Sequence, residues 1–313
     1  MTITHRTLTL VVPLILSACG GRAFEPLLGA DDNAVTITRP AQPALALCAT
    51  SDVTLGSNSE IFTFDQPSGT RSERAHVAAN GVLALSRNAH VEGSVVSGGD
   101  LVLENGAQVE GDGTYGGALT LPRRATIFGA LTSAAPAPAP CGCAPDIDQM
   151  FAQAAASNDN AELAASSPLA PYLVGGKLVI PRSTLVEIAR SAVLYVSELT
   201  VQRGAVFALN GSNTRLDIFV EGRVTIERGA EVEAHPGVHQ IWIYNRASWP
   251  IRLASSSTTC ARIHAPRAAV TFDAGARVLG AVQAASITLG SKARVRFDGA
   301  EVASPAPSCV AAP

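Results

Sequence analysis

Apolar residues alternate with polar ones in three segments that repeat one another along the chain. The segments read GVLALSRNAHVEG, GDLVLENGAQVEG and GALTLPRRATIFG, and they begin at Gly81, Gly99 and Gly117, 18 residues apart. Positions three, five, nine and eleven of each segment are apolar. A fixed period with alternating apolar residues is typical of a β-solenoid, in which each repeat forms one coil. The pattern predicts an all-β fold, a single-stranded parallel β-helix.

The same pattern returns less regularly in units that begin at Ser197, Gly222, Ala268 and Ala285. In all seven units position nine holds alanine, which is small enough for a point where two walls of a coil converge: Ala89, Ala107, Ala125, Ala205, Ala230, Ala276 and Ala293. Asn88 and Gly106 precede this alanine, and both are residues that favour turns. We therefore expect two solenoid sections, with long loops between some coils.

Composition shifts divide the chain into six segments. We expect a signal peptide at 1–18, a flexible tether at 19–50, a solenoid section at 51–132, a linker with a helix at 133–172, a second solenoid section at 173–303 and a tail at 304–313. Val53 to Phe64 alternates weakly, which indicates a capping strand. In the linker, Met150 and Phe151 belong to an apolar stripe at helical spacing from Asp146 to Ala156, typical of core packing. This helix would cross the solenoid or cap it.

The first residues resemble an export signal. A short apolar run, Leu8 to Leu16, follows Arg6 and is too short to span a bilayer. Leu16-Ser17-Ala18-Cys19 matches the bacterial lipobox. The resemblance implies cleavage before Cys19 and attachment of fatty acyl chains, such as palmitate, to that residue. Gly20 after the cysteine favours the outer membrane by analogy. The alternative is an ordinary secretory signal with a chance cysteine.

Export permits disulfides, and five cysteines remain after Cys19. These candidates for disulfide bonds are Cys48, Cys141, Cys143, Cys260 and Cys309. Because five is odd, at least one thiol stays free or pairs between chains. The Cys-Gly-Cys spacing is shorter than that of usual zinc pairs, so we expect disulfides and no metal.

Two families carry a resemblance. The three regular coils resemble those of the bactofilins, bacterial polymer-forming β-helical scaffolds, which implies possible self-association end to end. The section from Cys141 to Val302 is similar to uncharacterised secreted β-solenoid lipoproteins of Gram-negative bacteria. The similarity rests on Cys141-Gly142-Cys143, on Ala156-Ser157-Asn158-Asp159-Asn160 and on IFVEGRVTIERGAEVEA. Where that family often ends in His-Tyr-Asp, this chain has Arg296-Phe297-Asp298. The resemblance implies a fold and a location but no activity.

The sequence offers little catalytic chemistry. Glu92 and Glu110 share position twelve of neighbouring coils, so their carboxylates could lie about 4.8 Å apart, as in polysaccharide-cleaving β-helices. The third coil has Phe128 there, which favours a solvated face. Glu231 and Glu233 alternate on one strand face, with the same interpretation. No nucleophile motif is present, and we expect no enzyme, cofactor or metal.

Other polar and aromatic residues suggest binding only weakly. His235 and His239 flank Pro236-Gly237, which predicts a loop. Arginines at position seven could meet an anionic glycan, although solvated turn arginines are the ordinary case: Arg87, Arg123, Arg203 and Arg228. We expect Trp242 to be buried, and Trp249 to be a candidate ligand-binding residue if exposed. The formal net charge of −3 predicts no nucleic-acid partner.

These observations favour a non-enzymatic, lipid-anchored envelope scaffold on the outer membrane, held to the membrane through Cys19. The alternative is a carbohydrate-binding or polysaccharide-degrading β-helix at the cell surface, with a glycan as partner. A third hypothesis is adhesion through a long insertion between Ala234 and Ala268.

Overall fold

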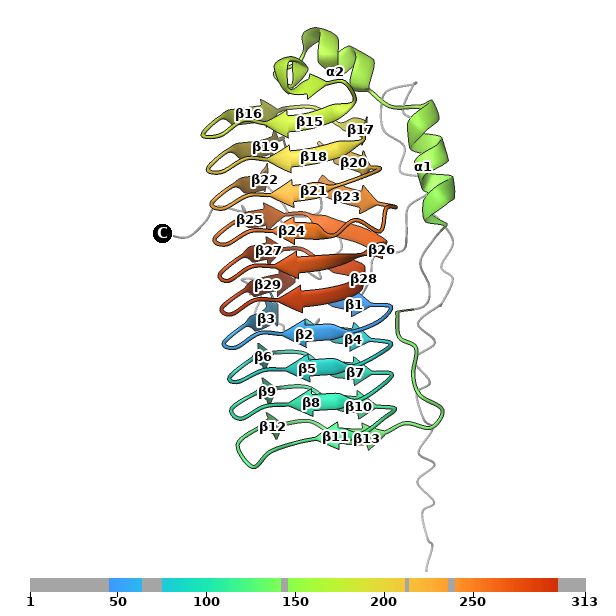
Figure 1. Ribbon diagram of the computed structural model, residues 1–313, viewed down its shortest axis with the longest axis vertical. Helices are drawn as coiled ribbons and strands as arrows, with labels where there is room; N and C mark the ends of the chain where they lie inside the picture. The colour runs from blue at the N-terminus through green and yellow to red at the C-terminus, as the bar shows by residue number, and fades with distance from the viewer. Residues whose placement is uncertain (1–44, 64–74, 142–145, 212–213, 236–239, 298–313) are drawn as a thin grey trace, which may run out of the picture.

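The computed structural model describes residues 45–63, 75–141, 146–211, 214–235 and 240–297, and these form a rod of stacked β-coils (Figure 1). Each coil passes through three short strands and so contributes to three faces of the rod. The strands form a 19-stranded and a 10-stranded sheet, and the larger sheet makes two faces because β26 (Arg262–Phe272) and β28 (Val282–Leu289) run round a corner. The predicted parallel β-helix is confirmed.

The first face, which we call the open face, contains one strand of each coil. From the helical end of the rod these are β15 (Lys177–Ile180), β18 (Glu198–Val201), β21 (Val224–Ile226), β24 (Ile251–Leu253), the second halves of β26 and β28, β2 (Val53–Leu55), β5 (Leu83–Leu85), β8 (Leu101–Leu103) and β11 (Leu119–Thr120).

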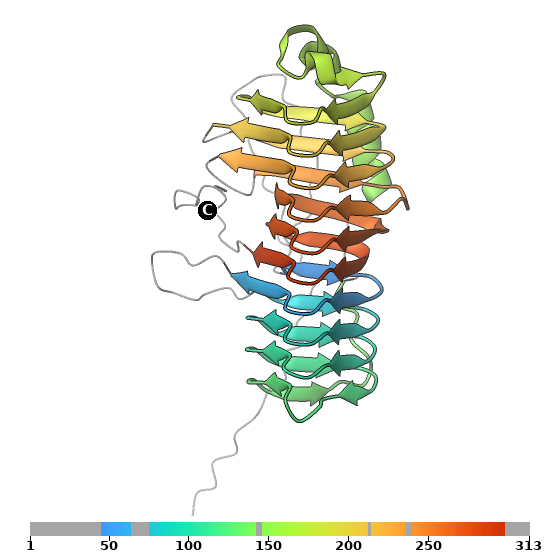
Figure 2. The same ribbon diagram turned by 60° about the vertical axis from the view of Figure 1, so that its left-hand side comes forward.

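The 10-stranded sheet forms a face of its own, which we call the third face (Figure 2). In the same order it contains β16 (Leu185–Ile188), β19 (Val206–Asn210), β22 (Glu231–His235), β25 (Thr258–Cys260), β27 (Arg277–Leu279), β29 (Arg294–Phe297), β3 (Glu60–Thr63), β6 (His90–Val91), β9 (Gln108–Val109) and β12 (Thr126–Ile127).

The remaining face, the covered face, lies beneath the helix α1 and the linker. It contains β17 (Ala192–Val196), β20 (Leu216–Val220), β23 (Ile241–Asn245), the first halves of β26 and β28, β1 (Leu47–Ala49), β4 (Val77–Ala79), β7 (Val95–Ser97), β10 (Gly113–Tyr115) and β13 (Leu131–Ser133).

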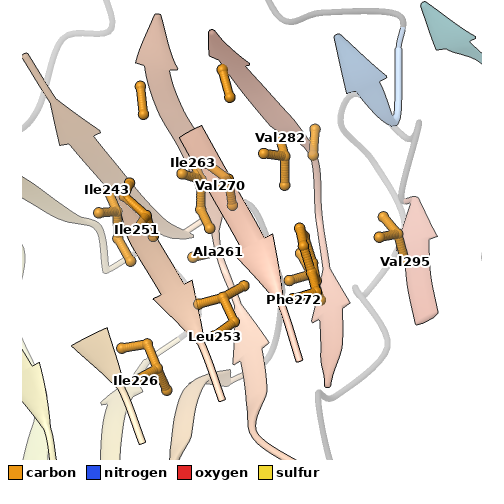
Figure 3. Close-up of a cluster of buried hydrophobic side chains, with 14 of the residues drawn as sticks. Ile226, Ile243, Ile251, Leu253, Ala261, Ile263, Val270, Phe272, Val282 and Val295 are labelled. Carbon is orange, nitrogen blue, oxygen red and sulfur yellow. The ribbon is translucent and has the colours of Figure 1, made fainter. Parts of the chain in front are cut away.

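The inward positions expected from the repeat form the core. In the coil that begins at Gly81, Leu83, Leu85, Ala89 and Val91 are fully buried. Figure 3 shows the same arrangement further along the rod, where isoleucine, valine and phenylalanine side chains from successive coils meet in the interior. The predicted turns are also confirmed, because Asn88 and Gly106 have positive φ at the corner between the open and third faces.

The first described strand, β1, lies in the middle of the rod. β1 pairs with β28 on one side and with β4 on the other, and β3 pairs with β29 (Figure 1). From β1 the coils proceed to one end, the linker returns along the covered face, and the later coils proceed from the opposite end back to the middle. The two solenoid sections therefore form one continuous stack.

This arrangement corrects two expectations. Residues 47–49 fall within the predicted tether but form a strand, in which Leu47 and Ala49 are fully buried. The segment from Val53 onward was expected to cap the solenoid, yet β2 and β3 form an internal coil that is paired on both sides. Both errors have one cause: one of the two partners of each of these strands lies at the far end of the sequence.

Three of the ten coils lack the alanine that identified the other seven. At the equivalent corner they carry a hydroxyl residue, Ser59, Thr184 or Ser257, each of which follows a residue with positive φ. Because the coil with Ser257 lacks the alanine, its residues were not recognised as a coil and were assigned to an insertion between Ala234 and Ala268. This segment contains β23, β24 and β25, which are regular strands of the stack, so the prediction of a long insertion was wrong.

The helix α1 (Ile147–Ala156) lies along the covered face (Figure 1). Its N-cap residue Asp146 accepts hydrogen bonds from the backbone N–H groups of Asp148 and Gln149. Its apolar stripe is buried, and the Phe151 ring meets the Phe219 ring edge-on at 5.2 Å between centroids. The predicted core role of this stripe is confirmed. The helix was expected either to cross the solenoid or to cap its end, and it crosses the coils.

The linker is fixed lower on the same face. A Cβ added to Gly116 would lie 2.5 Å from the Cβ of Ala137, so glycine allows the linker to approach closely. Asn80 Oδ1 accepts a hydrogen bond of 2.9 Å from the backbone N–H of Cys141. The Cys141 side chain forms a disulfide with Cys48 on β1, with a Cα–Cα distance of 5.6 Å.

Candidate interaction faces

A ladder of threonines lines the open face. The central outward position of each strand forms one column, and six of its ten residues are threonine: Thr200, Thr225, Thr271, Thr288, Thr54 and Thr120. The other four are Val179, Arg252, Ala84 and Val102. Threonines on neighbouring rungs, such as Thr200 and Thr225, present their methyl and hydroxyl groups one strand spacing apart, about 4.8 Å.

Ion pairs lie beside this column and, at Arg252, within it, in the upper half of the rod. Lys177 Nζ lies 3.0 Å from the Glu198 carboxylate, and the hydrogen bond from Lys177 lowers the pKa of that carboxyl group. Arg252 donates to Asp273 over 2.7 Å. These pairs are mostly solvent-exposed, so they contribute little to stability, but they make the face polar on both sides of the threonines.

Trp249 lies at the edge of the open face, just before β24. Its side chain is 56% exposed, and the guanidinium carbon of Arg223 lies 5.6 Å from its ring centroid. An exposed indole next to a cation can stack on a sugar ring. Trp242, in contrast, is 5% exposed, which confirms that it is buried.

The aromatic residues of the upper covered face lie beneath α1. Trp242 lies between the guanidinium groups of Arg215 and Arg262, at 5.4 and 5.3 Å from its ring centroid. Tyr195 donates a hydrogen bond to Glu221, and burial together with this bond raises the pKa of Tyr195 to about 12. Trp242 belongs to the same buried cluster as Met150 and Phe151 of α1, and Tyr195 packs against that cluster, so the helix makes this part of the face inaccessible to a ligand.

Glu92 and Glu110, which were considered as a catalytic pair, contact different partners. Backbone hydrogen bonds place Glu92 and Glu110 on neighbouring rungs of the third face, as expected. Glu92 Oε2, however, accepts a hydrogen bond of 2.5 Å from the backbone N–H of Thr63, whereas Glu110 Oε1 lies 3.1 Å from His90 Nε2. In that column of the last coil, Phe128 is 65% exposed. Each carboxylate is therefore held by a partner of its own.

Glu231, Glu233 and His235 project from one face of β22. Burial is the main reason that the pKa of Glu231 is raised, and a hydrogen bond with Glu233 raises it further. His235 Nε2 lies 3.3 Å from Glu233 Oε2. His235 is the last residue of β22, whereas the loop predicted at Pro236-Gly237 and His239 lie outside the described residues. Within the described ranges, no three His, Cys, Asp or Glu side chains are arranged to hold a metal.

The two ends of the rod differ. At the upper end, β14 (Leu173–Val174) pairs antiparallel with β15, and the helix α2 (Asn160–Ser166) and the 3₁₀ turn η1 (Ala170–Tyr172) lie above the first coil (Figure 1). Asp159 and Asn160 accept hydrogen bonds of 2.6 and 3.1 Å from the backbone of β17. This part of the Asn158-Asp159-Asn160 motif therefore covers a sheet edge, a role that its sequence alone did not indicate.

The lower end is formed by β11, β12 and β13, with two, two and three residues. Leu121 and Leu131 are each 41% exposed there, and Pro122 and Arg123 lie in the corner between β11 and β12. Short strands, proline and charge are features by which natural edge strands resist the addition of further strands.

The cysteine predictions are resolved in part. Cys48 and Cys141 form the disulfide described above, and Cys260 is also disulfide-bonded. Cys143, Cys309 and the proposed lipid-attachment residue Cys19 lie outside the described residues. Among the helices in the described ranges, none has the length and apolar character needed to cross a membrane.

Several solved structures show some similarity to this chain. An ice-binding protein from the Antarctic ascomycete Antarctomyces psychrotrophicus has 10% identity and a TM-score of 0.43, covering 82% of this chain and 96% of that one. The DUF3494 domain of a Shewanella frigidimarina ice-binding protein has 12% identity and a TM-score of 0.36, covering 83% and 100%. An ice-binding protein from an Arctic yeast has 12% identity and a TM-score of 0.37, covering 83% and 94%. Likenesses at these scores support no inference about a ligand.

No curated protein matches the chain. A family model does match: residues 133–301, more than half of the 313 residues, fit the family described as "Domain of unknown function (DUF7305)". The match includes the linker, α1 and the whole of the later solenoid section. It does not bear on the resemblance of the three regular coils to bactofilins, which stays a prediction. The chain belongs to the DUF7305 family.

Proposed function

We propose that this protein is a non-enzymatic interaction scaffold of the cell envelope, which binds its partner along the open face. The observation that carries this proposal is the threonine ladder, which supplies six of the ten residues in one column of the open face and has no described helix or strand packed over it (Figure 1). A rigid, flat and regularly spaced surface suits an extended, repetitive partner better than a small molecule, which needs a concave site.

The ends of the rod support a lateral mode of binding. A filament built end to end needs two free ends, and here Asp159, Asn160 and β14 occupy strand edges at the upper end. We therefore place self-association second to binding along the open face.

Attachment to the membrane through Cys19 belongs to the same proposal, and the lipobox supports it. Several acyl chains on one residue would hold the rod at the outer membrane for long periods. Metabolic labelling with a palmitate analogue should mark the wild-type protein and not Cys19→Ala, which should appear in the soluble envelope fraction. Equal fractionation of both proteins would disprove the anchor and leave the binding proposal standing.

The binding proposal is tested with the protein lacking its lipid and a panel of insoluble envelope surfaces: sacculi, outer-membrane vesicles and extracellular polysaccharide. Ice is included as a regular surface, because the threonine ladder repeats at a strand spacing. Two glutamates on the ladder, T225E together with T271E, should abolish sedimentation with the bound surface. The matched pair Q108E and T126E introduces the same charge on the third face and should bind as wild type. Equal loss in both pairs, or no binding to any surface, would refute the role of the open face.

A second candidate function is carbohydrate binding at Trp249, favoured by its exposed indole next to Arg223. Trp249→Ala should then weaken binding to specific glycans on an array, whereas Phe128→Ala, which removes another exposed aromatic side chain, should not. The separate partners of Glu92 and Glu110 support binding rather than cleavage. Activity that is lost in Glu110→Gln would contradict this interpretation and indicate an enzyme.

A further inference from the structure

Three arginines stand in one column at the corner between the open and third faces. We infer that Arg182, Arg203 and Arg228, which we call the arginine ladder, bind an anionic polysaccharide that runs parallel to the rod. This inference deepens the proposed scaffold function by naming a class of partner.

Backbone hydrogen bonds place the three residues on consecutive coils. The carbonyl oxygen of Arg203 accepts from the N–H of Ser183 at 3.2 Å, and that of Arg228 accepts from the N–H of Gly204 at 3.3 Å. Neighbouring arginines are therefore one strand spacing apart, about 4.8 Å. All three side chains are exposed, and the residue after each has positive φ, so each arginine lies at the outermost point of its corner.

The arginine ladder has no carboxylate partner among the described residues. Four other arginines in those residues do have one: Arg190 pairs with Glu162, Arg252 with Asp273, Arg267 with Asp148 and Arg294 with Glu60. None of the salt bridges formed within the described residues includes the guanidinium group of Arg182, Arg203 or Arg228.

Two polar side chains at this corner have backbone partners. Glu227 Oε2 accepts from the backbone N–H of Arg203 at 2.9 Å, and Gln202 Oε1 accepts from that of Arg182 at 3.1 Å. These two side chains stabilise the turns of the corner through the backbone, and the three arginine side chains are exposed to solvent.

Like charges on neighbouring rungs repel one another, so this column is unfavourable unless a negative ligand lies against it. A guanidinium group binds a carboxylate, sulfate or phosphate with two parallel hydrogen bonds. Because the corner is convex, it offers no pocket for a small anion, but a linear polymer with repeated anionic groups can contact all three residues at once. The hydroxyls of Thr200 and Thr225, one step inward on the open face, can meet sugar hydroxyls.

A polysaccharide fits these observations better than a nucleic acid does. The chain has a formal net charge of −3, and the positive charge at this site forms a single column. Binding of a duplex normally requires a broader basic surface.

The sequence also contains a matched control. Arg87, Arg123 and Arg124 lie at the same corner near the opposite end of the rod, and Asn105 separates Arg87 from the last coil. A triple substitution of these residues removes the same charge from the same kind of turn, but it leaves the arginine ladder intact.

Binding of polygalacturonate, a linear polymer with one carboxylate per sugar, is measured by biolayer interferometry at several salt concentrations. Dextran serves as the neutral probe and single-stranded DNA as the other polyanion. We expect R182Q/R203Q/R228Q to weaken polygalacturonate binding on the order of tenfold or more and to flatten its salt dependence, since bidentate charge-assisted contacts are lost. R87Q/R123Q/R124Q should stay within about twofold of wild type, which is the range expected when no such contact is lost. Both triple variants should unfold at the wild-type temperature.

Equal weakening by the two triple variants would indicate diffuse attraction and overturn the inference. Tighter binding of DNA than of polygalacturonate would overturn the ligand class, and the absence of any polyanion binding would overturn the site. Failure here is distinct from failure of the scaffold proposal. If the arginine ladder is wrong but the scaffold proposal is right, T225E/T271E still abolishes binding to the envelope surface while R182Q/R203Q/R228Q leaves it unchanged.

Discussion

Leu47 and Val282 lie opposite each other on neighbouring parallel strands of the covered face, although one is near the start of the described chain and the other near its end. This pairing, with those of β2 to β28 and β3 to β29, joins the two halves of the rod. The first strand of the sequence therefore closes a coil whose other two strands come last.

The joint predicts that a small change in the first strand destabilises the whole molecule. Leu47 is fully buried, so Leu47→Ala should lower the free energy of unfolding by about 2–5 kcal/mol, the usual range for a buried leucine. The same substitution at Leu185, which is 61% exposed on β16, should cost less than about 1 kcal/mol. Urea unfolding followed by circular dichroism measures both, and equal effects would contradict a structural role for β1.

The sequence pattern predicted which residues of a coil point inward, but it did not predict the order in which the coils stack. Leu83, Leu85 and Ala89 repeat at a constant interval, and that local regularity is enough to define inward positions. The pairing of Leu47 with Val282 leaves no local signal, because a three-residue strand has no period and its partner is distant in sequence. The arginine ladder was missed in part for a related reason: Thr184 replaces the corner alanine, so the coil that contains Arg182 was not aligned with the others.

The corner column suggests a stabilising substitution. Ser257 occupies the position where seven coils have alanine, and its hydroxyl is buried without a hydrogen-bond partner in the structure. Because burying an unsatisfied hydroxyl costs about 1–3 kcal/mol, Ser257→Ala should raise the free energy of unfolding by about 1 kcal/mol. Ser255→Ala, two residues away and less buried, should change it by no more than about 0.5 kcal/mol. A lower unfolding midpoint for Ser257→Ala would show that the hydroxyl has a structural role.

The disulfide between Cys48 and Cys141 should hold the linker against the joint. It closes a loop with a sequence separation of 93 residues, and both half-cystines are buried. The double variant C48A/C141A should therefore lose about 2–4 kcal/mol of unfolding free energy in the absence of reductant. Variants are better than reduction of the wild type here, because a reductant would also break the disulfide of Cys260. An unfolding midpoint equal to that of wild type would mean that packing alone fixes the linker.

His264 should make stability fall in mild acid. Its imidazole is 2% exposed on the covered face, with Nδ1 3.0 Å from Gln283 Oε1 and the Tyr244 ring 6.1 Å away. Burial lowers the pKa of His264 to about 4, against an ordinary value of 6.5. Above pH 6.5 the imidazole is neutral in both the folded and the unfolded chain. Between pH 6.5 and 4 only the unfolded chain takes up the proton, which favours unfolding.

The linked loss of stability across this window is about 3 kcal/mol, since one pKa unit corresponds to about 1.4 kcal/mol. His264→Gln removes the titrating group and keeps a polar side chain of similar reach. Urea unfolding at pH 7, 5.5 and 4.5 should show that the wild type loses stability more steeply than the variant, even though other groups titrate in both. His90→Gln makes the same substitution at a partly exposed site on the third face and serves as the matched control. If the three proteins lose stability in parallel, the buried imidazole takes no part in the acid response.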